Sequence, residues 1–445
     1  MSPLSMQTDS VQGTAENKSL ETNGTSNDQQ LPWKVLGKSL GLPTIEQEQY
    51  WLNTAPYFNN LLIQCGYDVH QQYQYLAFYH RHVLPVLGPF IRSSAEANYI
   101  SGFSAEGYPM ELSVNYQASK ATVRLGCEPV GEFAGTSQDP MNQFMTREVL
   151  GRLSRLDPTF DLRLFDYFDS QFSLTTSEAN LAASKLIKQR RQSKVIAFDL
   201  KDGAIIPKAY FFLKGKSLAS GIPVQDVAFN AIESIAPKQI ESPLRVLRTF
   251  VTKLFSKPTV TSDVFILAVD CIVPEKSRIK LYVADSQLSL ATLREFWTLG
   301  GSVTDSATMK GLEIAEELWR ILQYDDAVCS HSNMDQLPLV VNYELSSGSA
   351  TPKPQLYLPL HGRNDEAMAN ALTKFWDYLG WKGLAAQYKK DLYANNPCRN
   401  LAETTTVQRW VAFSYTESGG AYLTVYFHAV GGMKGNLRSH HHHHH

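Results

Sequence analysis

The sequence predicts an α+β fold, namely one closed barrel of ten antiparallel β-strands ringed by α-helices. Short β-rich runs come in five pairs, and amphipathic helical stretches fill the intervals between the pairs. Helix and strand markers also share a period of roughly 70 to 80 residues. Such a period indicates an internal repeat, in which helices are followed by a hairpin.

The five pairs of runs have the turn chemistry of β-hairpins, because most partners are joined by a short link carrying Gly, Pro, Asp or Ser. The predicted pairs are 108–117 with 120–128, 194–201 with 206–213, 263–270 with 278–284, 338–345 with 354–360, and 408–416 with 421–428.

Helices are expected between the pairs. Asp365 is expected to cap a helix that ends at Gly380 and places Leu372 and Phe375 on one face. The stretch 293–300 resembles the second half of that helix. Tyrosines repeat on the strands at spacings of 72, 75 and 69 positions, at Tyr210, Tyr282, Tyr357 and Tyr426.

Helices can bury one face of such a sheet, so the other face must be buried by closing the sheet on itself. A ten-stranded barrel is wide enough to enclose a ligand. Within 410–415, the odd-numbered residues suit packing beneath helices, whereas Trp410, Ala412 and Ser414 suit a lumen. A two-domain enzyme is the alternative, but no linker divides 40–430.

Composition divides the chain into three parts. Residues 1–30 are rich in Ser, Thr, Asn, Gln and Gly and are expected to be a disordered lead-in. Residues 31–437 are expected to form one barrel domain. Residues 438–445 are expected to be a cloning scar and histidine tag.

Bulk properties exclude several classes of protein. The net charge of −2 provides no general field for nucleic acid, and no apolar run is long enough to span a membrane. Five widely spaced cysteines without a CxxC pair indicate a cytoplasmic protein with reduced thiols. No metal site is expected, because Asp325-Asp326 and the pair Asp166 and Asp169 lack the third carboxylate of a DDxxD motif.

A basic or polar residue precedes a tyrosine by two positions on several strands, so both side chains share a face. The pairs are Lys208 with Tyr210, Lys280 with Tyr282, and Gln355 with Tyr357; Arg278 shares the face of Lys280, Tyr422 that of Tyr426, and Arg124 lies in a similar run. Exposed faces of edge strands are the alternative explanation. Recurrence in register with the repeat favours one shared lumen.

A lumen with four basic residues implies a polyanionic ligand, because buried cations are costly unless an anion compensates them. A diphosphate suits both the fork of arginine and the point charge of lysine. Tyrosine rings would stabilise a carbocation through their π faces and exclude water. Together these features indicate ionisation of an allylic diphosphate.

Glu111 begins the first predicted strand on the lumen face. Pairing with Arg124 is one possible role. The functional alternative is that Glu111 accepts a hydrogen bond from an indole N–H and so orients an aromatic acceptor.

These motifs resemble the fungal dimethylallyltryptophan synthase family of indole prenyltransferases over about residues 40–430. The resemblance lies in Met110-Glu-Leu-Ser, Thr122-Val-Arg, Lys208-Ala-Tyr, Arg278-Ile-Lys-Leu-Tyr, Gln355-Leu-Tyr and Tyr422-Leu-Thr-Val-Tyr. It implies the family's barrel of repeated ααββ units.

The resemblance also implies roles for individual residues. Diphosphate contacts are expected from Arg124, Lys208, Arg278, Lys280 and Gln355. A shield around the carbocation is expected from Tyr210, Tyr282, Tyr357, Tyr422 and Tyr426. Glu111 would bind the indole N–H, and Trp410 is expected in the acceptor pocket.

Two positions depart from relatives that act on free tryptophan. Val195 occupies the place of a catalytic lysine, with Lys194 adjacent, and Thr416 replaces an arginine after the ninth strand. Both departures fit an acceptor without a free amino-acid carboxylate.

The resemblance is greatest to members that act on tryptophan-containing cyclic dipeptides or benzodiazepinediones, as in the acetylaszonalenin pathway. The expected reaction is metal-independent transfer from dimethylallyl diphosphate to indole C3, in the reverse sense, with ring closure to an indoline. Another acceptor or attachment position, a hydrolase or cyclase of the same diphosphate, and a carrier barrel for an anionic isoprenoid are the alternatives.

Overall fold

The computed structural model describes residues 30–91, 97–235, 238–324 and 337–437. The expectations for the start of the chain, for the tag and for Asp325-Asp326 therefore lie outside the described residues.

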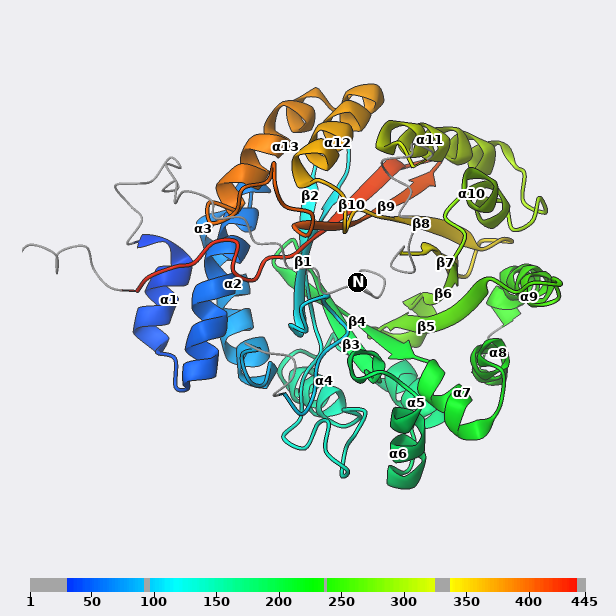
Figure 1. Cartoon of the computed structure of the whole chain (residues 1–445), viewed down its shortest axis with the longest axis horizontal. Helices are drawn as coiled ribbons and strands as arrows, with labels where there is room; N and C mark the ends of the chain where they lie inside the picture. The colour runs from blue at the N-terminus through cyan, green and yellow to red at the C-terminus, as the bar shows by residue number, and fades with distance from the viewer. Residues whose placement is uncertain (1–29, 92–96, 236–237, 325–336, 438–445) are drawn as a thin grey trace, which may run out of the picture.

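The predicted barrel is confirmed. Ten antiparallel strands close on themselves in the order β1-β10-β9-β8-β7-β6-β5-β4-β3-β2 (Figure 1). The strands are β1 (Met110–Tyr116), β2 (Ala121–Cys127), β3 (Lys194–Lys201), β4 (Ala204–Phe212), β5 (Ser262–Asp270), β6 (Ile279–Asp285), β7 (Leu339–Leu345), β8 (Lys353–Pro359), β9 (Gln408–Thr416) and β10 (Gly420–Phe427). Each predicted run overlaps one of these strands.

Helices ring the barrel in groups that precede each hairpin (Figure 1). In the described residues the groups are α1 (Pro32–Leu40), α2 (Ile45–Gln64) and α3 (Val69–Phe78); α4 (Met145–Leu156), α5 (Arg163–Phe172) and α6 (Thr176–Ser184); α7 (Lys214–Ser220), α8 (Val224–Ile235) and α9 (Glu241–Phe255); α10 (Leu290–Trp297) and α11 (Ser306–Leu322); and α12 (Asp365–Leu379) and α13 (Lys382–Asn395). The first three groups each carry one helix more than the repeated unit requires. None of the helices described is both long and apolar enough to span a bilayer.

Strand alternation produces two separate apolar clusters. On β9, Val411 and Phe413 belong to the outer core, where Phe413 stacks on Trp297 of α10 with ring centroids 5.6 Å apart. Trp410 and Ala412 belong to a smaller inner cluster with side chains from β3 to β8 and β10. The alternation predicted for this strand is therefore confirmed.

The cap of α12 differs from the prediction by one residue. Asn364 is the N-cap, and its side-chain oxygen accepts a hydrogen bond from the helix backbone at 2.9 Å. Asp365 is fully buried and accepts hydrogen bonds from Thr404 Oγ1 at 2.6 Å and from the backbone N–H groups of Val407 and Gln408 at 3.1 and 2.9 Å. Asp365 therefore anchors the segment that enters β9.

Replacing Asp365 by Ala should lower the free energy of unfolding by about 3 kcal/mol, because several buried donors lose a charged acceptor. Denaturant unfolding followed by circular dichroism measures this change. The control is Asp377→Ala on the same helix, where the exposed ion pair with Lys382 contributes less than about 1 kcal/mol. Equal losses in the two variants would contradict the anchoring role.

Candidate active site

The strand register sorts the lumen side chains into layers. Because the strands are antiparallel and consecutive, the five hairpin turns lie at the same end of the barrel. The basic residues near that end are Arg124 on β2, Lys208 on β4, and Arg278 and Lys280 at the start of β6. Tyr210, Tyr282, Tyr357 and Tyr426 lie further from the turns, and Glu111 and Trp410 lie near the opposite end.

Asp199 of β3 holds two of these cations together. Its Oδ1 lies 3.0 Å from Arg124 Nε, and its Oδ2 lies 2.9 Å from Lys208 Nζ. Burial opposes ionisation of Asp199, but Arg124 and Lys208 outweigh it and hold the pKa of the carboxyl well below its usual value. The carboxylate therefore stays charged and fixes the position of both bases.

Arg278 contacts two further carboxylates. Its Nε lies 2.9 Å from Asp270 Oδ2, and its Nη1 lies 3.3 Å from Glu344 Oε1. Although burial opposes ionisation of Asp270, the hydrogen bonds and charge of Arg278 lower the pKa of this carboxyl. This arginine is thus held by the barrel wall itself.

The alternation of single strands does not single out Asp199, Asp270 and Glu344. The expectation that a ligand alone compensates the buried cations is therefore only partly right. Carboxylates of the barrel wall supply part of the negative charge. Cross-strand pairing is the signal that finds them, since Arg124 lies directly opposite Asp199 and Lys208 opposite Asp270.

Lys280 differs from the other three cations. Among the described residues, no carboxylate forms an ion pair with its ammonium group. Burial, followed by the charges of Arg278 and Lys208, lowers the pKa of Lys280 to about 7. Lys280 is therefore poised to gain or lose a proton near neutral pH.

Four tyrosines form a continuous belt next to the cations. Ring centroids are 6.2 Å apart for Tyr210 and Tyr282, 5.7 Å for Tyr282 and Tyr357, and 6.1 Å for Tyr357 and Tyr426. Burial raises the pKa of each phenol, so the belt is uncharged at neutral pH. It presents aromatic surface without competing negative charge.

Gln355 joins this belt, whereas Tyr422 stands apart from it. Asn342 Nδ2 donates hydrogen bonds to Gln355 Oε1 at 2.9 Å and to Tyr357 OH at 3.0 Å. The Tyr422 hydroxyl lies against Gly419 in the β9–β10 turn, so close that a Cβ on that glycine would overlap it. Within the described residues, no ring contact links Tyr422 to the other four tyrosines.

Glu111 is buried, and Arg409 is its ion-pair partner. Arg409 Nε lies 3.7 Å from Glu111 Oε2, whereas Arg124 is engaged with Asp199. The register between β9 and β10 shifts beside Arg409, which makes it the extra residue of a β-bulge. Strict alternation would direct Arg409 outward, so the sequence pattern does not reveal it.

Glu106 and His428 extend this end of the lumen. Arg409 Nη1 lies 3.2 Å and His428 Nδ1 3.5 Å from Glu106 Oε2. Burial, with the charges of Arg399 and Arg409, holds the pKa of His428 well below its usual value, so its ring is neutral. Trp410 is fully buried in the inner cluster, and its indole N–H has no hydrogen-bond partner among the described residues.

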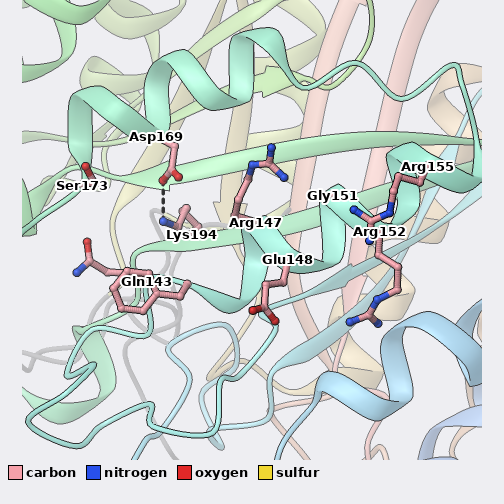
Figure 2. A pocket seen from close by; sticks show the side chains of 10 residues that line it. Gln143, Arg147, Glu148, Gly151, Arg152, Arg155, Asp169, Ser173 and Lys194 are labelled. Atoms are coloured by element: carbon pink, nitrogen blue, oxygen red, sulfur yellow. Dashed lines mark hydrogen bonds and ion pairs between the residues drawn. The ribbon is translucent and has the colours of Figure 1, made fainter.

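Lys194 lies outside this arrangement. Figure 2 shows its side chain directed at Asp169 of α5, with Nζ 2.7 Å from Oδ1. Val195, by contrast, belongs to the inner cluster, as its predicted place requires. The outer groove beside Lys194 has a volume of about 580 Å³ and carries Arg147, Arg152 and Arg155 of α4.

The described residues contain no group of three or more His, Cys, Asp or Glu side chains placed to hold a metal ion. Asp166 and Asp169 instead pair with Arg147 and Lys194, each at 2.7 Å.

A closed barrel ringed by helices, with cations and a tyrosine belt inside, defines the class of aromatic prenyltransferases. The chain belongs to the tryptophan dimethylallyltransferase family, whose model matches residues 46–391. It is therefore an indole prenyltransferase that transfers dimethylallyl groups.

Three similar proteins place it within this family. The solved structure of AnaPT from Neosartorya fischeri is 97% identical, covers 91% of this chain and 100% of AnaPT, and superposes with a TM-score of 0.88. NotF, solved with brevianamide F and DMSPP, is 31% identical over 90% of this chain and 99% of its own, with a TM-score of 0.80. The trans-prenyltransferase abpB of Aspergillus terreus is 43% identical over 83% of this chain and 94% of its own.

Replacing Lys280 by Met should raise the melting temperature of the ligand-free protein, because a partly buried cation without an ion pair is removed. The gain should be about 2 kcal/mol at pH 6. It should shrink toward pH 9, because the unfolded chain binds more protons at this lysine and wild-type stability rises above pH 7. Differential scanning fluorimetry measures the change, with half-exposed Lys353→Met as the control. An unchanged or lower melting temperature would disprove that Lys280 destabilises the ligand-free barrel as an uncompensated cation.

Proposed function

We propose that the enzyme transfers dimethylallyl from dimethylallyl diphosphate to a tryptophan-derived cyclic dipeptide or benzodiazepinedione. The reaction proceeds without metal through an allylic cation. It attaches the group to indole C3 in the reverse sense and closes the ring to an indoline. The observation that carries this proposal is the order of the lumen layers, in which cations, tyrosines and then Glu111 follow one another along the barrel.

The cation layer binds the diphosphate. Contacts come from Arg124, Lys208, Arg278, Lys280 and Gln355. As the bond between the allylic carbon and oxygen breaks, the electron pair leaves with the diphosphate, and the basic residues stabilise the growing negative charge. They supply the positive charge that Mg²⁺ supplies in enzymes with Asp-rich motifs.

The tyrosine belt receives the cation. Its π faces stabilise the positive charge, and its buried rings exclude water that would convert the cation to an alcohol. Tyr210, Tyr282, Tyr357 and Tyr426 suit this role by their ring contacts. Tyr422 lies nearer the β9–β10 turn and would close the diphosphate end.

The acceptor occupies the far end beside Glu111 and Trp410. Glu111 accepts the indole N–H hydrogen bond and raises the electron density of the ring. Indole C3 then attacks the tertiary carbon of the allylic cation. An amide nitrogen of the acceptor adds to C2 of the iminium ion that this attack leaves, and its proton is released together with the diphosphate, which completes the indoline.

We also propose that residues 31–437 act as one catalytic domain in the cytoplasm. Strands from both ends of this range pair to close the barrel, which supports a single unit. Cys65, Cys127 and Cys271 are free thiols, as a reducing compartment favours.

The deciding experiment incubates the enzyme with dimethylallyl diphosphate and a cyclic tryptophan dipeptide or benzodiazepinedione in EDTA. Prenylated product is expected, and NMR should show a quaternary C3 that carries the reverse-attached group. A requirement for Mg²⁺ would overturn the metal-free mechanism. Release of dimethylallyl alcohol alone would indicate a hydrolase, and binding without chemistry a carrier. Glu111→Ala with unchanged turnover would remove the role given to that carboxylate.

Binding of inorganic diphosphate should weaken above pH 7, because Lys280 must be protonated to contribute its charge. The expected fall is about ten-fold per pH unit relative to Lys280→Arg, whose guanidinium stays charged throughout. Calorimetry between pH 6 and 8.5 measures both proteins, and their ratio removes the ionisation of diphosphate itself. Parallel profiles would contradict a titrating Lys280.

A further inference from the structure

Arg409 and Glu106 form a buried ion pair, and each side chain has a further polar atom that lies outside this pair. Their side chains are 1% and 9% exposed, and Nη1 lies 3.2 Å from Oε2. In the part of the chain that the structure describes, Arg409 Nη2 and Glu106 Oε1 have no hydrogen-bond partner. Buried polar atoms are nearly always satisfied, so an open donor next to an open acceptor indicates a ligand group that carries both.

The position of this pair connects it to the acceptor. The β-bulge turns Arg409 inward, and its Nε lies 3.7 Å from Glu111 Oε2. A molecule held at Glu111 therefore lies within reach of Arg409 Nη2 and Glu106 Oε1. This step rests on the proposed function, in which Glu111 takes the indole N–H.

We propose that Arg409 and Glu106 form a subsite for a cyclic amide of the acceptor. Arg409 Nη2 donates to the amide carbonyl, and Glu106 Oε1 accepts from the adjacent amide N–H. A six- or seven-membered lactam holds its amide in the cis form, so that C=O and N–H lie on the same edge. That edge matches a donor and an acceptor side by side.

The same chemistry explains selection against other indoles. A linear amide is trans and directs C=O and N–H to opposite sides. A free amino acid would bring a carboxylate next to Glu106 and Glu111, where like charges repel. Arg409 and Glu106 thereby act as specificity-determining residues.

Glu106→Gln tests the subsite with the least disturbance of Glu111, because Arg409, the ion-pair partner of Glu111, stays in place. Two acceptors are compared, a cyclic tryptophan dipeptide and 3-methylindole, which has no amide. The variant should lose at least ten-fold in kcat/KM for the dipeptide relative to 3-methylindole, while KM for dimethylallyl diphosphate stays within two-fold. Arg409→Lys, which keeps the charge but loses the fork, should show the same preference.

Matched controls are Asp166→Asn and Arg147→Lys, which alter an ion pair of the same kind outside the barrel. Neither should change the ratio between the acceptors. Equal losses for both acceptors in Glu106→Gln would reduce the pair to a structural role and overturn the proposal, as would no loss.

Calorimetric titration of the cyclic dipeptide keeps the inference separate from turnover. Binding should weaken at least ten-fold in Glu106→Gln and in wild type when the amide nitrogens are methylated. If wild type prenylates neither acceptor, the proposed function fails, and the titration alone decides the subsite. The proposed amide subsite would be overturned if affinity were unchanged both in Glu106→Gln and for the methylated dipeptide.

Discussion

The lumen depends on the compensation of buried positive charge by carboxylates of its own wall. Asp199 bridges Arg124 and Lys208, and Arg278 is held by Asp270 and Glu344. Without these carboxylates the ligand-free barrel would hold several bases at a cost of several kcal/mol each. With them, the proposed binding of a diphosphate would be an exchange of anions around preformed cations. Such an exchange would limit affinity for the product while keeping the bases oriented for the next substrate.

The layers along the barrel separate tasks that interfere with one another. In the proposed reaction a carbocation forms beside an anion yet reacts with a neutral ring, so the surface between them must be aromatic and uncharged. Burial keeps the phenols of Tyr282 and Tyr357 protonated, which satisfies that condition. The polar groups proposed to orient an acceptor lie at the far end, where Glu111 and Arg409 compensate each other.

Much of this arrangement follows from periodicity, because a period of two assigns each strand residue to the lumen or the outer core. Lys208 and Tyr210 can therefore be placed on one face from their spacing alone. The bulge at Arg409 could not be foreseen, because the residue types of β9 do not indicate where the extra residue lies. Asp199 and Glu344 required knowledge of which strands pair. Asn364 and Asp365 are both good caps, so propensity could not choose between them.

The closure of the barrel by its first and last strands has a consequence for biosynthesis. Asn115 on β1 donates a hydrogen bond to Thr424 on β10, 309 positions later. A nascent chain that lacks β10 exposes the unpaired edges of β1 and β9, and open edges invite pairing with other chains. Contacts of such long range also slow folding. The polypeptide therefore cannot enclose its reaction chamber until β10 has been synthesised, and its exposure to misassembly is concentrated in the interval before that strand pairs with β1.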